Sequence, residues 1–383
     1  MQFSCNRKEL LAAAKRTARA ASTSTKVNVL TGMLIQADAD NYELTLTATN
    51  MEIAISCTVS APVASGGSIV INAMLFVEML SLLDGQTVEV TAHPNEHISI
   101  SSGATQYLVA GLPAESFPPL QIPEQAEAVP ICSLKGVAKQ TVFAAAKSGN
   151  LAMQCIKLET RQNSFRAIGC DGSILSSSRR EISDGKDMQL LIPSSSLSVL
   201  AGLVEDQEEL LLSADEKQAV FRSPEHNMVF TTRLGNGSYL DADGVLASIV
   251  KQYEAVVDAA EFRRALDGVC TLLGSVLVNL TFSLGEISMS SETEVGTAKD
   301  AAAAQVFAVT PEEGFHYQGR KLLQGIQTMQ GPIRLSLSDA GILLVTSAEQ
   351  SFMQTPSRKL IVKSKKKTAK AEKTTKKSKA KAA

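Results

Sequence analysis

The sequence predicts an α+β protein with three similar domains in tandem, each with two helices packed on antiparallel sheets. The first observation is an order of elements, a helix, a set of strands, a second helix and a hairpin, which recurs three times between residues 7 and 347. The second is period-two alternation of apolar and polar residues between the helices, which is typical of half-buried antiparallel strands. A repeat of roughly 120 residues is too long for a solenoid unit, so each copy is expected to bury its own core.

The first third begins with a helix at 7–21, in which Leu10, Ala14 and Thr17 share one face. Apolar and polar residues then alternate, most clearly over Tyr42–Thr49. We therefore expect strands at 30–36, 43–49, 52–59 and 68–71, a helix near 73–83 and a hairpin over 88–100.

The middle third centres on 164–182, which contains two short strands folded about Asp171-Gly172. An Asp-Gly pair favours a tight hairpin turn. Around it we expect helices at 134–147 and 194–205, strands at 153–159 and 188–192, and a hairpin of 219–222 with 228–233.

The last third ends with the clearest hairpin, 333–347, in which Asp339-Ala340-Gly341 supplies the turn. Glu292–Ala304 is polar and rich in alanine, and we expect a long loop there. The other expected elements are helices at 261–273 and 319–329 and strands at 277–283, 286–290 and 315–317.

Two segments are expected to be linkers. Prolines break regular structure before 122–129, which is polar, and the acidic run Asp241-Ala242-Asp243-Gly244 lacks the downstream glutamate of a calcium loop. Beyond Leu360 the chain is mostly Lys, Ala, Thr and Ser, a composition that predicts disorder. The expected boundaries are a first domain 1–121, a linker 122–129, a second domain 130–240, a linker 241–246, a third domain 247–362 and a disordered lysine-rich tail 363–383.

Composition indicates a soluble protein of a reduced compartment. Hydrophobic residues make up 44% of the chain, and no apolar run reaches the roughly 18 residues of a membrane helix. The six cysteines include no C-x-x-C pair and follow no secretory segment, which fits the cytoplasm.

The charge is distributed unevenly. The chain has 37 Lys+Arg and 39 Asp+Glu, but Lys363–Ala383 alone holds ten lysines and one glutamate. The remaining body therefore carries 27 basic and 38 acidic residues, a net charge of −11. An acidic body with a basic tail indicates a protein that meets a polyanion.

The first predicted helix has a basic stripe of Lys8, Lys15 and Arg19 opposite its apolar face. Such a stripe is often only a solvated face. Because Lys135 and Lys139 repeat it in the second third, and Arg320 with two glutamines in the last, we favour a shared surface that faces a polyanion.

The sequence contains no recognisable catalytic or metal site. Walker A, H-E-x-x-H and G-x-S-x-G motifs are absent, and His93 and His97 would lack a third ligand. Ser194-Ser195-Ser196 precedes a helix and is better explained as an N-cap than as a nucleophile. We expect no enzyme activity, no metal and no cofactor.

Several segments in order resemble one family. They are MQFSCNRKELLAAAKRTARA at the start, VLTGMLIQ, LTLTATNMEIAI from Leu44, LPAESFPPL from Leu112, FRAIGCDG from Phe165, TTRLGNGSYLD from Thr231 and TPSRKL from Thr355. The chain resembles the beta subunit of bacterial DNA polymerase III, the DNA sliding clamp, from Met1 to about Leu360.

The resemblance implies the DNA clamp fold: a ring-shaped homodimer that encircles double-stranded DNA and tethers the polymerase for processive synthesis. It also implies as partners the DNA polymerase III catalytic subunit, the clamp loader and other clamp-binding-motif proteins, in the cytoplasm and at the nucleoid. No membrane partner is implied. The DNA-facing channel would then contain Lys8, Lys15, Arg16, Arg19, Lys26, Lys135, Lys139, Lys147, Arg320 and Lys321.

The family also has a partner-peptide pocket between its second and third domains. Carried over to this chain, the pocket would contain Met153, Cys170, Gly172, Ser173, Ile174, Leu175, Leu240, Val245, Met353, Thr355, Pro356, Ser357 and Arg358. Ser173 and Ile174 replace the family's His-Arg pair, which predicts a changed peptide preference. The family's dimer interface would contain Tyr107 and Val109 against Leu272 and Leu273.

Two other classes of function stay open at this point. A non-clamp DNA-binding structural protein would explain the basic tail, but aromatic residues for base stacking make up only 4% of the chain. An enzyme of unrecognised chemistry would need a deep polar pocket. The tail itself is expected to add phosphate contacts outside the ring, or else to act only as a solubilising appendage.

Overall fold

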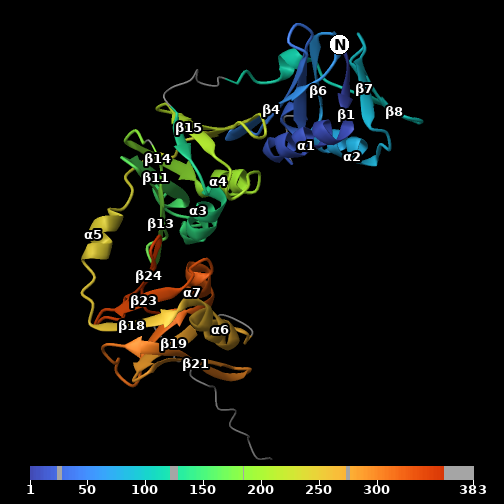
Figure 1. Cartoon of the computed structure of the whole chain (residues 1–383). Helices are drawn as coiled ribbons and strands as arrows, with labels where there is room; N and C mark the ends of the chain where they lie inside the picture. The colour runs from blue at the N-terminus through green and yellow to red at the C-terminus, as the bar shows by residue number, and fades with distance from the viewer. Residues whose placement is uncertain (24–27, 121–127, 184, 273–276, 358–383) are drawn as a thin grey trace, which may run out of the picture.

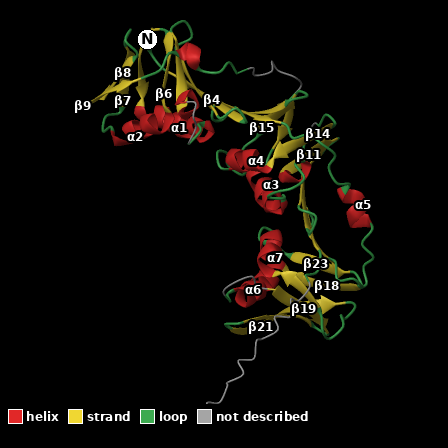
Figure 2. Ribbon diagram, turned by 180° about the vertical axis from the view of Figure 1, so that it is seen from behind, coloured by secondary structure: helices red, strands yellow, loops and turns green. Residues whose placement is uncertain are grey.

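The computed structural model describes residues 1–23, 28–120, 128–183, 185–272 and 277–357. These residues form a crescent of three repeats, which we call the first (1–120), second (128–240) and third (253–357) repeat (Figure 1). Helices line the concave side and sheets form the outer side, as the view from behind also shows (Figure 2).

Each repeat places two helices on the concave side (Figure 2). The pairs are α1 (Arg7–Thr17) and α2 (Ala73–Leu82), α3 (Leu134–Thr141) and α4 (Ser194–Ala201), and α6 (Ala259–Cys270) and α7 (Gly319–Ile326). The side chains of Asn6 and Asp258 cap α1 and α6 by accepting backbone N–H groups of the first turn. Short 3-10 turns at 18–20 and 142–144 follow α1 and α3, so these α-helices are shorter than expected.

The strands of the described residues form three antiparallel sheets. In spatial order, the first sheet is β5 (Val63–Ser65), β1 (Gln2–Asn6), β7 (Thr87–Ala92), β8 (His97–Ser102) and β9 (Thr105–Ala110). The second is β10 (Val129–Ile131), β15 (Leu210–Ala214), β16 (Gln218–Ser223), β17 (Met228–Arg233), β4 (Ile53–Ser60), β3 (Glu43–Thr49), β2 (Gly32–Asp38) and β6 (Gly67–Asn72).

The third sheet is, in the same spatial order, β14 (Met188–Pro193), β11 (Cys155–Arg161), β12 (Ser164–Cys170), β13 (Ile174–Glu181), β25 (Gln350–Gln354), β24 (Leu343–Thr346), β23 (Pro332–Leu337), β18 (Tyr253–Asp258), β21 (Gly296–Val306), β20 (Glu286–Thr293), β19 (Leu277–Ser283) and β22 (Phe315–Gln318). By element order β4, β13 and β21 are equivalent strands of the three repeats, and so are β9, β17 and β25. The second and third sheets each cross a boundary between repeats.

Equivalent strands pair across the two boundaries between repeats. The last strand of the second repeat, β17, pairs with β4 of the first repeat, and the last strand of the third, β25, pairs with β13 of the second. One apolar core cluster consequently extends through the first and second repeats, and another fills the third. The expectation of a separate core for each copy is therefore not met, since even the cluster that fills the third repeat includes Ala144 and Ile174 of the second.

One expectation on local structure was wrong. The expected loop at 292–304 instead contains the end of β20 and most of β21, a strand between β18 and β20 whose alanines give no apolar alternation to detect. The expected linker 241–246 contains most of a short helix, α5 (Ala242–Ala247), capped by the Asp241 side chain, which accepts the Gly244 N–H. The hairpin about Asp171-Gly172 is confirmed, with Gly172 at a φ of 90°. No described helix is both long and apolar enough to cross a membrane.

Candidate nucleic-acid interface and partner face

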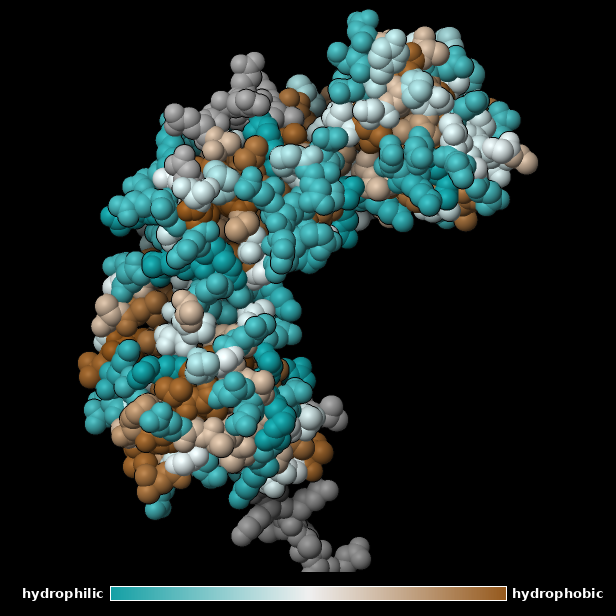
Figure 3. Space-filling model, viewed as in Figure 1, coloured by the Kyte–Doolittle hydropathy of each residue, from teal (hydrophilic) through white to brown (hydrophobic). Residues whose placement is uncertain are grey.

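Most of the basic residues predicted for the channel are exposed to solvent. Lys135 makes an ion pair of 3.0 Å with Glu205, and Lys26 lies outside the described residues. The exposed ones are Lys8, Lys15, Arg19, Lys135, Lys139, Lys147 and Arg320. Hydrophilic side chains border most of the concave side in the space-filling view (Figure 3), a surface to which a phosphate backbone can bind without reading sequence.

Arg16 and Lys321, also predicted for the channel, are half-buried and bridge repeats instead. The Arg16 guanidinium lies 3.2 Å from Nδ1 of His226 in the β16–β17 turn. His226 Nε2 in turn lies 3.5 Å from the buried carboxylate of Glu208. Arg16 therefore links α1 of the first repeat to the second repeat.

Lys321 of α7 reaches back to the second repeat. Its Nζ lies 2.5 Å from Oδ2 of Asp171, whose Oδ1 accepts the Ser173 N–H, the Ser173 hydroxyl and the Ile174 N–H. Partial burial raises the pKa of Asp171, but the bonds from Lys321, Ile174 and Ser173 outweigh it and hold that pKa below its ordinary value. This carboxylate thus organises its own turn and the junction.

Sequence reasoning missed two cations of α6. Arg263 donates Nη1 to the carbonyl oxygen of Gln327 at 2.7 Å, and Arg264 pairs with Asp300 at 3.1 Å. The two arginines are adjacent in the helix expected at 261–273, and this pair of basic residues was the sequence signal for them.

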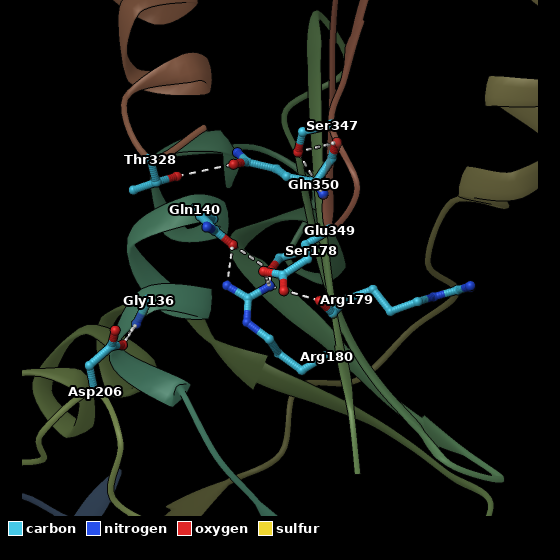
Figure 4. Close-up of polar contacts among 10 residues, drawn as sticks. All are labelled: Gly136, Gln140, Ser178, Arg179, Arg180, Asp206, Thr328, Ser347, Glu349 and Gln350. Atoms are coloured by element: carbon cyan, nitrogen blue, oxygen red, sulfur yellow. Dashed lines mark hydrogen bonds and ion pairs between the residues drawn. The ribbon is translucent and has the colours of Figure 1, made fainter. Parts of the chain in front are cut away.

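A polar groove of about 840 Å³ lies where the second and third repeats meet. Lys139 of α3 and Arg263 of α6 line it from the two repeats. Beneath them the Ser178 hydroxyl donates to Oε1 of Gln140 at 2.5 Å, and Arg180 donates to the same oxygen at 3.1 Å (Figure 4).

Arg180 also binds across the junction to the third repeat. Its Nη1 lies 3.0 Å from the carboxylate of Glu349, in the β24–β25 turn (Figure 4). Gln350 beside it donates to the Gly325 carbonyl at 2.9 Å and accepts from Thr328 at 3.0 Å. The floor of the groove is therefore a bonded network, while its cationic rim faces solvent.

The predicted pocket residues divide into two groups. An apolar cluster at the outer side of the same junction brings together Cys170, Leu175, Leu240, Val245 and Met353. Sequence reasoning missed its other members, which are Ile168, Tyr239, Ala242, Leu246, Ile249, Ile342 and Leu344. Alternation along β12, and along β24 with the residue before it, was the signal for Ile168, Ile342 and Leu344.

The remaining predicted pocket residues are not members of this cluster. Ile174 is 0% exposed and packs in the core of the third repeat. Gly172 is exposed; Met153, Ser173, Thr355, Pro356 and Ser357 are half-buried; and Arg358 lies outside the described residues. Thr355 N–H donates to the Ser173 carbonyl at 2.9 Å, so the end of β25 is tied to the turn before β13.

A buried arginine fixes α5 near the cluster. Arg166 of β12 is only 8% exposed, donates to Ser177 at 2.8 Å and forms an ion pair of 2.8 Å with Asp243 of α5. A buried guanidinium needs such partners, because an uncompensated charge in the interior is costly. The linker helix is thus held against the outer face of the sheet.

The predicted dimer residues lie at the two ends of the crescent. Tyr107 and Val109 of β9 pack against the core, while Leu108 between them points outward and is 63% exposed. β9 ends the first sheet and pairs only with β8 among the described strands. Leu272 packs against the core of the third repeat, and Leu273 lies outside the described residues.

The described residues contain no group of three His, Cys, Asp or Glu side chains that could hold a metal ion. All six cysteines are free, and burial raises the pKa of the Cys5, Cys57, Cys155 and Cys170 thiols. Reactive cysteines have depressed rather than raised thiol pKa values. These thiols are therefore core residues.

Comparisons with known proteins all find similarity to bacterial beta sliding clamps. The family model of the DNA polymerase III beta subunit, N-terminal domain, matches residues 1–121. A beta sliding clamp of Bacillus subtilis is 26% identical over 377 residues, covering 92% of this chain and 98% of the relative. One of Staphylococcus aureus is 25% identical and covers 79% of this chain and 84% of the relative.

Solved structures agree in fold. The DNA polymerase sliding clamp of Bacillus subtilis superposes with a TM-score of 0.87 at 23% identity, covering 94% of this chain and 100% of that one. A putative DNA polymerase III beta subunit of Eubacterium rectale also gives 0.87, at 18% identity, covering 93% and 99%. A Pseudomonas aeruginosa sliding clamp, solved bound to griselimycin, gives 0.84 at 19% identity, covering 94% and 99%.

Proposed function

We propose, from the premise that this chain belongs to the DNA polymerase III beta subunit family of sliding clamps, that two copies close head to tail into a ring around duplex DNA. Members of this family are non-catalytic processivity factors. The chain is accordingly a DNA sliding clamp and not an enzyme.

The observation that carries ring closure is the repeated strand pairing between repeats. Thr232 of β17 lies opposite Ile53 of β4, and Gln354 of β25 lies opposite Ile174 of β13. The third equivalent pair, β9 and β21, is not made within the described chain. An open strand edge is an aggregation hazard unless it is covered, so a second copy is its natural partner.

The same rule gives the register of the proposed interface. Gly296 is the first residue of β21, as Ile53 and Ile174 are of their strands, and Val109 is the fifth residue of β9. The equivalent pairing places Gly296 opposite Val109 and Thr297 opposite Leu108 of the other copy. A head-to-tail contact that closes after two copies gives a ring rather than a filament.

Exposed apolar side chains at the first repeat support this interface. Met74 and Leu82 of α2 are each 62% exposed, and Leu108 of β9, in the same repeat, is 63% exposed. Covering such side chains stabilises an interface by about 25 cal/mol per Å² of apolar area. On the third repeat, Leu272 and the alanines of β21 would meet them.

The remaining functional expectations follow from this ring. The concave basic residues would contact DNA phosphates, and the acidic outer surface would face solvent. The outer cluster around Leu240 and Val245 would receive apolar anchors of the polymerase catalytic subunit, the clamp loader and other clamp-binding proteins. We propose three domains at 1–121, 130–240 and 247–362, and a place in the cytoplasm at the nucleoid.

Disulfide cross-linking tests the ring. A chain carrying Leu108→Cys and Thr297→Cys places the two new thiols on directly opposed residues, whose Cα atoms lie about 4.5 to 5.5 Å apart in an antiparallel pair. This separation fits a disulfide. Mild oxidation should convert the protein to a covalent dimer on a non-reducing gel.

The matched control moves one thiol along the same strand. Leu108→Cys with Ala301→Cys shifts the second thiol by roughly 13 Å along the strand, so no cross-link should form. The single Leu108→Cys variant reports any reaction with the native cysteines. A chain that stays monomeric after oxidation of the first pair, or that cross-links equally in both pairs, would reject the proposed interface.

A further inference from the structure

The outer apolar cluster at the junction of the second and third repeats is only partly covered. Tyr239, Leu240, Val245, Leu246 and Ile342 are half-buried against it and expose the rest of their side chains. Hydrophobic side chains also appear on the outer side of the molecule in this region (Figure 3). We name these five residues the junction face.

The described chain ends beside the junction face in a fixed direction. Thr355 donates both its N–H and its hydroxyl to the carbonyl oxygen of Ser173, at 2.9 and 3.3 Å. Ser357 N–H donates to the carbonyl oxygen of His316 at 2.7 Å. The backbone is therefore held between the turn before β13 and β22 when it leaves the described structure.

The residues that follow contain one apolar run. Leu360-Ile361-Val362 comes three residues after Ser357, and no Leu, Ile, Val, Met or aromatic residue follows it. Three to five extended residues span roughly 10 to 16 Å, which is within reach of the face on which the chain ends. Basic residues flank the run, Arg358 and Lys359 before it and Lys363 after it.

The charges around the junction face are of the opposite sign. Asp241 and Asp243 lie among its residues on the linker, Asp243 being paired with Arg166, and Asp339 precedes Ile342 by three residues; all three are exposed. The segments 239–249, 338–344 and 353–357, which build or border the face, contain no Lys or Arg. An apolar segment between basic residues thus matches an apolar face with an acidic border.

We propose that Leu360-Ile361-Val362 of this chain docks on the junction face. A tether of a few residues gives an effective concentration in the millimolar range, so even weak intrinsic binding keeps the face mostly occupied. The inference rests on the proposed function for its consequence: an incoming partner peptide must displace this segment before it binds. The lysines beyond Val362 are then held at the outer side of the ring.

A labelled probe peptide with the sequence of residues 358–365, RKLIVKSK, tests the proposal by fluorescence anisotropy with full-length proteins. The variant Leu360→Ser, Ile361→Ser, Val362→Ser keeps every charge of the chain but frees the face. It should bind the probe at least ten times more tightly than the unmodified protein does. A probe with the same three serine replacements should bind the variant at least ten times more weakly.

Two further variants complete the test. Lys365→Ser, Lys366→Ser, Lys367→Ser removes charge but keeps the apolar run, so it should bind the probe as weakly as the unmodified protein. Adding Val245→Asp to the free-face variant should abolish probe binding; Ile342→Asp serves if that protein fails to fold. Equal probe binding by unmodified and free-face proteins would overturn the proposal. The Leu108–Thr297 cross-link, measured on the same proteins, reports the ring independently.

Discussion

Lys321 and Asp171 form an ion pair of 2.5 Å that joins α7 of the third repeat to the turn before β13 of the second. Their side chains are 31% and 18% exposed, so solvent screens the pair only in part. A lysine expected to face DNA thus serves first to hold two repeats together.

Lys321→Ala should therefore reduce the free energy of unfolding by about 1 kcal/mol at neutral pH. The loss comes from the missing partner of a half-buried carboxylate. Arg320→Ala, one residue away and exposed, should change it by less than about 0.5 kcal/mol. Chemical denaturation measures both, and equal effects of the two substitutions would show that the pair does not stabilise the junction.

The contribution of this pair should depend on pH in a definite direction. Because the folded-state pKa of Asp171 lies below its ordinary value of 3.8, the pair's contribution is fully present above that value. It is lost as the pH falls through the folded-state pKa. The stability difference between Lys321→Ala and the unmodified protein should accordingly shrink below pH 3.8; a constant difference would contradict this assignment.

Two glycines in helices should respond oppositely to alanine. A Cβ at Gly325 of α7 would lie 2.5 Å from the Phe352 ring of β25, so Gly325→Ala should destabilise the protein by about 1 to 3 kcal/mol. A Cβ at Gly268 of α6 meets only a carboxylate oxygen of Asp300, at 3.3 Å. Gly268→Ala should instead stabilise by up to about 1 kcal/mol, as helix propensity predicts. Thermal unfolding of both variants checks the signs.

The groove cations should contribute to DNA binding through charge alone. Lys139→Ala and Arg263→Ala should each lower the slope of log K against log salt by about 0.9. Lys251→Ala, at an exposed lysine four residues after the end of the linker helix α5, should leave the slope unchanged. Titration of a short duplex at several salt concentrations measures this; an unchanged slope in the two groove variants would remove these side chains from the interface.

The sequence predicted local structure well where one face of an element is buried. The strands on either side of Asp171-Gly172 alternate and α1 has an apolar stripe, and both the hairpin and the helix form as predicted. β21 was missed because its run of alanines carries no strong apolar alternation. The repeat structure was visible, but the local pattern does not specify which strand edges pair across repeats.

The candidate site was predictable in part for the same reason. The exposed position of Lys139 follows from its place on an amphipathic helix. The partners of Lys321 and Arg16 lie 150 and 210 residues away, so only the folded chain brings them together. Ile174 aligns with a pocket position of the family, yet its side chain points into the core.

Trapping on circular DNA tests the central claim, a ring that encircles duplex, most directly. The Leu108→Cys, Thr297→Cys protein is mixed in reduced form with a closed circular plasmid, oxidised, and then washed at high salt, which removes electrostatic binding. The account predicts that oxidised protein stays with the circle and is released when the plasmid is cut once. Release at high salt before cutting, despite full cross-linking, would contradict it.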